Sequence, residues 1–198
     1  MTSSPGDRLK LAQPKPIRSL EEQRREFASR PLLAMPIAGA IAWSVVGCGG
    51  MLLPSRAAAM VLFVATGMTL YLGMFISRFT GENFLDRSRP KNAFDALFFF
   101  TVGQSLLTYA IAIPFFMVDH TSLPLTVGIL TGTMWLPMAW ILQHWVGLFH
   151  GLTRTSLVVT AWYVFPAHRF VVIPAVIVAV YLVSIAVLAR RARPQSIL

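Results

Sequence analysis

The sequence predicts an all-α integral membrane protein: a polytopic bundle of six transmembrane helices with its N- and C-termini both cytoplasmic. Three observations support this fold class. Of the 198 residues, 56% are hydrophobic and only 13% are charged, whereas soluble domains carry about 25% charged residues. Six apolar blocks follow one another, most of them near the ~20 residues that cross about 30 Å of hydrocarbon. The lysines and arginines gather in the tails and in alternate loops.

The N-terminal part of the chain precedes the apolar blocks. Its first residues are polar, include three prolines and have no apolar period, which predicts a disordered basic tail. Ser19 and Glu22 have the spacing of a capping box, so a short surface helix is expected from Leu20 to Ser29. The chain thus divides into a disordered tail, a short cytoplasmic surface helix, the six-helix domain and a basic C-terminal tail, at residues 1–18, 19–30, 31–189 and 190–198.

The apolar blocks are the expected spans, and Pro137 is the proline best placed to kink one of them. A secretory signal is the alternative for the first block, because a basic segment precedes it. That block is much longer than the ~7–15 apolar residues of a signal, and another span follows at once. The expected spans are Pro31–Leu53, Ala57–Ser77, Phe94–Met117, Leu123–Leu142, a fifth between His144 and Phe165, and Phe170–Ala189.

Charge sets the expected orientation. In the six-span model 15 of the 17 lysines and arginines lie in the cytoplasm, with Arg154 counted in the loop before the fifth helix. Only Arg56 and Arg169 remain outside, as the positive-inside rule requires. The net charge of +9 does not indicate nucleic-acid binding, because it is spread over tails and loops rather than along one face.

The fifth block holds the least expected residues. Its apolar part, Thr155–Phe165, is too short to span alone. If the helix begins earlier, His150 and Arg154 share one face and form a polar site for an anion or a proton, with His144 nearby. If it begins near Gly151, Arg154 reaches the cytoplasmic interface and both histidines lie in a loop.

Other polar and small residues have two interpretations each. Thr101, Gln104, Ser105 and Thr108 share one face of the third span, where they line a solute path or bond neighbouring helices; packing is the simpler explanation. In the second loop Glu82 or Asp86 could pair with Arg154, or the loop is merely solvated. Small residues recur every fourth position, so they pack helices of this chain or bind a partner or second copy. These seams are Ala34, Ala38 and Ala42, and Gly128 and Gly132.

Several stretches resemble an uncharacterised family of small bacterial six-helix membrane proteins, a domain of unknown function. The resemblance covers roughly residues 20–189 and implies a bacterial cytoplasmic-membrane location, but no activity. The matching stretches are Leu20–Phe27, Leu33–Gly39, Tyr71–Phe84, Tyr109–Phe116, Leu123–Pro137 and Gln143–Gly151.

The function expected from these patterns is small-solute transport or binding. No zinc-protease, phosphate-loop, nucleophile-elbow or Cys-x-x-Cys motif occurs, and no cofactor or metal is expected. The alternatives are an accessory or assembly subunit of a membrane complex and, third, an intramembrane enzyme. Besides the lipid bilayer, a membrane protein or second copy is the partner expected. The expected polar interior comprises His150, Arg154, Gln104, Thr108, Glu82 and His144.

Overall fold

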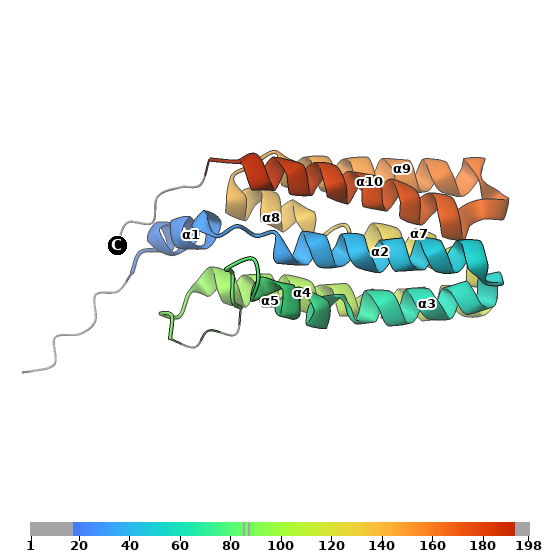
Figure 1. Cartoon of the computed structure of the whole chain (residues 1–198), viewed down its shortest axis with the longest axis horizontal. Helices are drawn as coiled ribbons and strands as arrows, with labels where there is room; N and C mark the ends of the chain where they lie inside the picture. Colours follow the sequence, from blue (N-terminus) through green and yellow to red (C-terminus); the bar gives the residue numbers. More distant parts are fainter. Residues whose placement is uncertain (1–17, 85, 87, 193–198) are drawn as a thin grey trace, which may run out of the picture.

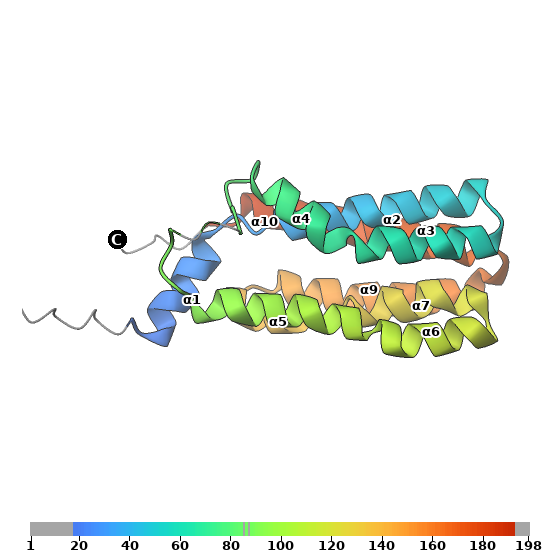
Figure 2. The same ribbon diagram turned by 90° about the horizontal axis from the view of Figure 1, so that it is seen from below.

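The computed structural model describes residues 18–84, 86 and 88–192, so most of both predicted tails lies outside it. Every regular element within these residues is a helix, and the helices run along one long axis (Figure 1). Figure 2 shows two layers: α2, α3, α4 and α10 form one, and α5, α6, α7 and α9 belong to the other. The elements are α1 (Leu20–Ser29), α2 (Ala34–Leu52), α3 (Ser55–Gly67), α4 (Thr69–Ser77), α5 (Ala93–Leu107), α6 (Tyr109–Val118), η2 (His120–Ser122), α7 (Leu123–Leu130), α8 (Trp135–Leu142), α9 (Val146–Val164), η3 (Pro166–His168) and α10 (Arg169–Arg190).

The surface helix α1 has the bounds that its sequence predicts. The Ser19 hydroxyl accepts from the backbone N–H of Glu22, and the Glu22 carboxylate accepts from the backbone N–H of Ser19, which completes the capping box. Phe27 is buried and packs against the rings of Phe94 and Phe98 in α5. The helix is therefore fixed to the end of the bundle.

Several elements can cross a membrane by length and composition. Within the described residues four stretches qualify: α2, α5 with α6, η2 through α8, and η3 with α10. A fifth is added if α3 and α4, which meet at 40°, form one bent span. Helix α9 is as long as α2, but its polar first half keeps it outside this set. These helices indicate a membrane protein.

Three of the expected spans are broken in the middle. The breaks fall at Met68, at Thr108 and over residues 131–134. Threonine hydroxyls beside each break donate to carbonyls of their own helix, as Thr66 does to Leu62 and Thr131 to Val127, and such bonds bend helices. The third break lies one turn before Pro137, whose ring would clash with the carbonyl four residues earlier. The expected kink at that proline is therefore a full interruption just before it.

Glycines set the closest helix contacts. A Cβ atom on Gly39 of α2 would lie 2.5 Å from the Tyr181 ring of α10, and one on Gly50 would lie 2.2 Å from the Phe170 carbonyl oxygen. These two helices therefore approach each other at backbone distance, and the approach places Tyr181 at the centre of the bundle.

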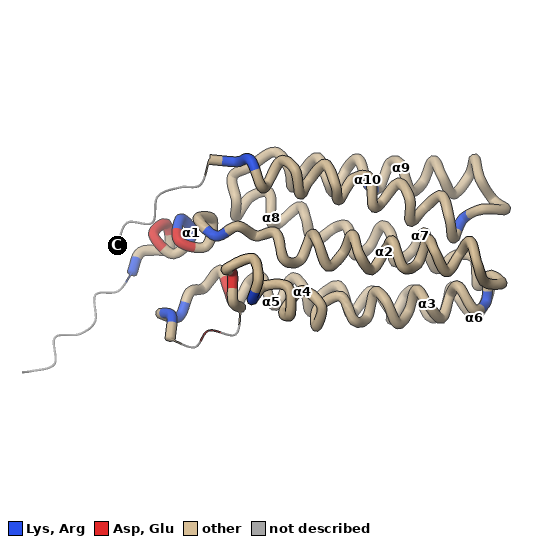
Figure 3. Tube along the Cα trace, viewed as in Figure 1, with Lys and Arg blue, Asp and Glu red and all other residues tan. Residues whose placement is uncertain are grey.

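Apart from Arg154, the charges of the described residues gather at the two ends (Figure 3). One end holds α1, the loop from α4 to α5 and the end of α10; at the other end lie Arg56 and Arg169. The prediction that places Arg154 in a loop is wrong, because Arg154 lies in the middle of α9 and is fully buried.

Candidate functional site

The buried face of α9 carries the polar residues of the bundle interior. Helix α9 begins at Val146, so His150 and Arg154 are one turn apart on the same face, and both are 0% exposed. The interpretation in which the helix starts near Gly151 and Arg154 reaches the interface is therefore wrong. Gly147 makes this burial feasible: a Cβ there would lie 2.6 Å from the Ala139 nitrogen, so α8 crosses α9 at backbone contact.

Arg154 is held by three acceptors, two at the carboxyl end of α7 and one in α10. Its Nε donates to the Gly128 carbonyl oxygen at 2.7 Å, Nη2 to the Thr131 hydroxyl at 2.8 Å and Nη1 to the Tyr181 hydroxyl at 3.2 Å. The guanidinium also lies 5.4 Å from the ring centre of Trp43 and 5.5 Å from that of Tyr181. A guanidinium has five N–H donors, so two remain after these bonds.

The helix break supplies the first of these acceptors. In an unbroken helix the Gly128 carbonyl would accept from the N–H of Gly132, but that N–H donates to Ile129 at 2.8 Å instead. The freed oxygen lies at the carboxyl end of α7, where the helix dipole favours a positive charge. Arg154 therefore caps α7 at its break.

No carboxylate compensates the charge of Arg154 among the described residues, whose ion pairs all join other side chains. The expected pairing with the second loop is absent: Glu82 accepts from the backbone of Leu33 and Ala34, and Asp86 pairs with Arg89. A buried charge is normally paired. Arg154 is thus a buried cation that lacks an anion.

His150 lies between aromatic rings of α8 and α10. Its ring stacks on Trp135 at 3.9 Å and meets the edge of Tyr181 at 4.6 Å. Its Nδ1 is 2.9 Å from the Ser184 hydroxyl, which donates its own proton to the Val180 carbonyl. The serine oxygen can then only accept, so Nδ1 carries the ring proton. Nε2 is then unprotonated, and this buried nitrogen has no hydrogen-bond partner among the described residues.

A cavity of about 70 Å³ lies where the three broken spans meet. Its wall includes Thr131 and Tyr181, the two hydroxyl groups to which the guanidinium donates. Residues beside each break line much of it: Thr66, Gly67 and Thr69; Ser105, Leu106 and Tyr109; and Thr131 and Met134. The broken helices therefore line a space beside the hydroxyl groups that hold the buried cation.

Three predicted site residues lie elsewhere. Gln104 is exposed, because successive residues turn by about 100° and the buried side of α5 runs through Phe98, Thr101 and Ser105. Thr108 is buried, but its hydroxyl donates to Ser105 of its own helix at 2.7 Å. His144 lies in the turn before α9, where its Nδ1 accepts from the Val146 N–H. None of the three faces Arg154.

The sequence interpretation overlooked the partners of α9. Tyr181 and Ser184 hold Arg154 and His150, and Trp43 and Trp135 cover them. A signal for the first two exists: they are the polar side chains within an otherwise apolar span, and three residues apart they share a face. Tryptophans in apolar spans give no comparable signal.

Both small-residue seams lie inside the bundle. Ala34, Ala38 and Ala42 are buried, and Cβ atoms on Gly128 and Gly132 would meet Ile177 and Arg154. In this structure these seams pack helices of the same chain.

Comparisons with known proteins place the chain in a family without assigning an activity. No curated protein and no solved structure matches it. One family model matches residues 20–191, which run from the start of α1 to just beyond the end of α10. The chain belongs to a family of unknown function, DUF7010.

Proposed function

We propose that this protein binds a small anion at Arg154 and passes it across a bacterial cytoplasmic membrane. The observation that supports this function is a fully buried guanidinium with two unused N–H donors and no carboxylate partner among the described residues. Ionisable residues at membrane depth are costly and mark solute or proton paths. Broken helices around a central site are also a feature of secondary transporters.

The size of the cavity limits the solute. About 70 Å³ accommodates a few water molecules or an anion of a few heavy atoms. The guanidinium and the hydroxyl groups of Thr131 and Tyr181 suit a monoanion such as a halide, formate or acetate, whereas the faces of Trp43 and Tyr181 are occupied by their contacts with the guanidinium. The buried seams do not favour the alternative of an accessory subunit.

The anion site is tested by thermal melting in detergent at constant ionic strength. Acetate or chloride at about 100 times its Kd should raise the Tm by about 5–10 °C relative to gluconate, which is too large for the cavity. Arg154→Gln should abolish this difference. Arg169→Gln, which removes an arginine at the far end of the bundle, should preserve it.

Two results would contradict the anion site: equal Tm values of the wild type in acetate and gluconate, or an unchanged acetate response in Arg154→Gln. The comparison of Tm in acetate and in gluconate for the wild type tests the anion site even if Arg154→Gln does not fold. Uptake of acetate into proteoliposomes, lost in the same variant, would extend binding to transport.

We also propose six spans, with α9 as one of them and the α1 end in the cytoplasm. The arrangement of charge at the two ends supports this orientation. Single cysteines introduced into a Cys48→Ala variant test it in intact cells. An impermeant thiol reagent should label Ala167→Cys, between α9 and α10, and should label Lys91→Cys only after lysis. The reverse pattern would refute the orientation.

A further inference from the structure

Glu82 is a loop residue whose side chain is directed into the bundle. It follows α4 and is flanked by Gly81 and Asn83, whose φ angles are 76° and 36°, a left-handed conformation that glycine and asparagine tolerate best. The backbone N–H groups of Glu82 and Asn83 both donate to the Ser77 carbonyl, at 3.0 and 2.9 Å. The chain therefore turns back on itself here, and Glu82 is 0% exposed.

One carboxylate oxygen of Glu82 caps α2. Oε1 accepts from the backbone N–H groups of Leu33 at 2.7 Å and Ala34 at 2.9 Å, at the positive end of that helix. The preceding residue, Leu32, has a φ of 54°, which side chains of its kind rarely adopt. The backbone is therefore strained at Leu32, directly before the two N–H groups that donate to the carboxylate.

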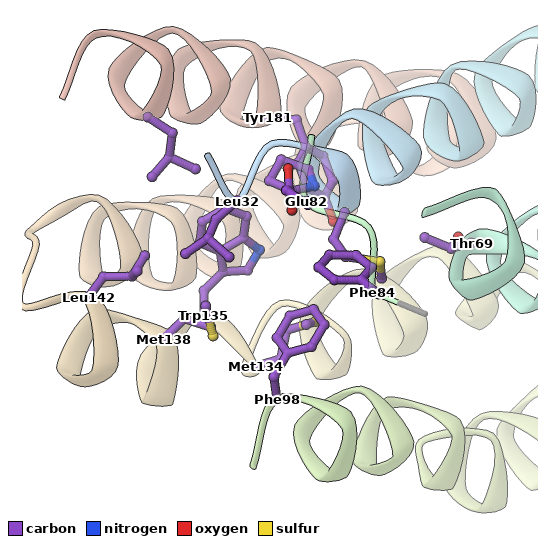
Figure 4. Close-up of a pocket in the computed structure, with 13 residues that line it drawn as sticks. Leu32, Thr69, Glu82, Phe84, Phe98, Met134, Trp135, Met138, Leu142 and Tyr181 are labelled. Atoms are coloured by element: carbon purple, nitrogen blue, oxygen red, sulfur yellow. The ribbon is translucent and has the colours of Figure 1, made fainter. Parts of the chain in front are cut away.

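The second oxygen has no hydrogen bond of normal geometry: the Thr80 hydroxyl lies close enough to lower the pKa of the carboxyl, but it donates to the Ser77 carbonyl. Oε2 is buried and forms no hydrogen bond among the described residues, while Glu82 lines a cavity of about 60 Å³ (Figure 4). Trp135, Tyr181 and Phe98 form part of the wall, and Glu82 is the one charged residue among the described residues that line it. The cavity is large enough for water, which the orphaned oxygen would need as a partner.

The charged groups around Glu82 do not neutralise it. Arg30 acts on it from a distance but pairs with Asp95 and Glu26. Arg89 donates to the backbone carbonyl of Glu82 rather than to its carboxylate. No described ion pair includes this side chain.

We propose that Glu82 is a proton-binding site. A proton that reaches the cavity through water adds to Oε2 and converts the carboxylate into a carboxylic acid, whose O–H then donates to cavity water. Oε1 continues to accept from Leu33 and Ala34, so α2 stays capped in both states. The site stands on the geometry of Glu82 and does not depend on an anion at Arg154.

The electrostatic balance agrees with this assignment. Burial raises the pKa of Glu82 above its ordinary value of 4.5, and the backbone N–H groups of Ala34 and Leu33, the Thr80 hydroxyl and Arg30 lower it only in part. Hydrogen bonds or nearby positive charges lower the pKa of other carboxyls of the described chain. Those are Glu21, Glu22, Asp86 and Asp119.

Infrared spectroscopy of the full chain in detergent tests the site directly. At about pH 6, where an ordinary glutamate is almost fully ionised, the wild type should retain the carbonyl stretch of a protonated carboxyl. This band should be absent from Glu82→Gln, in which a neutral amide takes the place of the acid. It should persist in the control Glu22→Gln, which removes a carboxylate from the exposed cap of α1.

The pH dependence of melting gives a second measurement. Because the pKa of Glu82 is higher in the folded than in the unfolded chain, the bound proton stabilises the fold at low pH, and this contribution is lost as pH rises through the folded pKa. Glu82→Gln stays neutral throughout. Its Tm relative to the wild type should therefore increase from about pH 5 to pH 8. A wild type without the Glu82-dependent band, or a Tm difference that is independent of pH, would overturn the proposal.

Discussion

Arg154→Leu is expected to lower the free energy of unfolding by about 3 kcal/mol. Hydrogen bonds to a charged group contribute about 1.5–3 kcal/mol, and a buried acceptor that loses its donor destabilises the fold. Leucine donates to none of the three acceptors, and the Gly128 carbonyl at the break of α7 loses its described partner. The variant no longer bears the cost of burying a charged guanidinium, which offsets part of this destabilisation. The carboxyl end of α7 nevertheless stays uncapped. Thermal melting in detergent should show a decrease in Tm of about 6–12 °C.

The double variant Arg154→Leu with Glu82→Gln tests whether Arg154 caps α7 or forms an ion pair with Glu82. If the two side chains were partners, the second change would recover part of the loss. Because Glu82 caps α2 instead, the two effects should add within about 0.5 kcal/mol. Arg190→Leu, at an exposed arginine that ends α10, is the matched control and should be nearly neutral. Substantial rescue by Glu82→Gln would contradict the contacts described for Arg154.

Gly147→Ala is expected to cost at least about 3 kcal/mol, the upper end of the range for overpacked cores. The added Cβ would meet the backbone nitrogen of Ala139 and the carbonyl oxygen of Trp135, each at 2.6 Å. Backbone atoms cannot rotate away as a side chain does, so α8 and α9 must separate. The variant should melt well below the wild type and should also lose the stacking of His150 on Trp135, which quenching of tryptophan fluorescence would report.

Gly103→Ala is the control for this substitution. Gly103 also lies inside a helix, but a Cβ there has nothing within 4 Å. Alanine favours the helix by up to about 1 kcal/mol over glycine, so this variant should be as stable as the wild type or more so. Equal destabilisation by both changes would mean that glycine flexibility matters rather than the contact of α8 with α9.

Local signals predicted the ends of helices better than their interiors. The capping box at Ser19 defines α1 because both of its hydrogen bonds lie within four residues. The apolar blocks give α2 and α10 for a similar reason, since hydrocarbon thickness selects their length. The three breaks do not follow from composition: each half remains apolar, and the interruption depends on hydroxyl bonds and on partners from other spans.

In the candidate site, too, contacts within one helix could be predicted from the sequence, whereas contacts between distant segments could not. The spacing of His150 and Arg154 predicts that they share a helix face, and they do. Whether Arg154 finds a carboxylate depends on the path of the second loop, which turns at Gly81 and Asn83 and sends Glu82 to α2. Spacing along the chain carries no information about that turn.

The breaks have a consequence for biogenesis. Helices α7 and α8 have eight residues each, or about 12 Å apiece at 1.5 Å per residue. Neither covers the ~30 Å of hydrocarbon alone, and the turn between them frees the Gly128 carbonyl from the N–H of Gly132, which donates to Ile129 instead. The Gly128 carbonyl at this break accepts from Arg154, which lies in the later helix α9, so this hydrogen bond can form only after α9 has been synthesised. Folding of this span is in that sense completed by a later part of the chain.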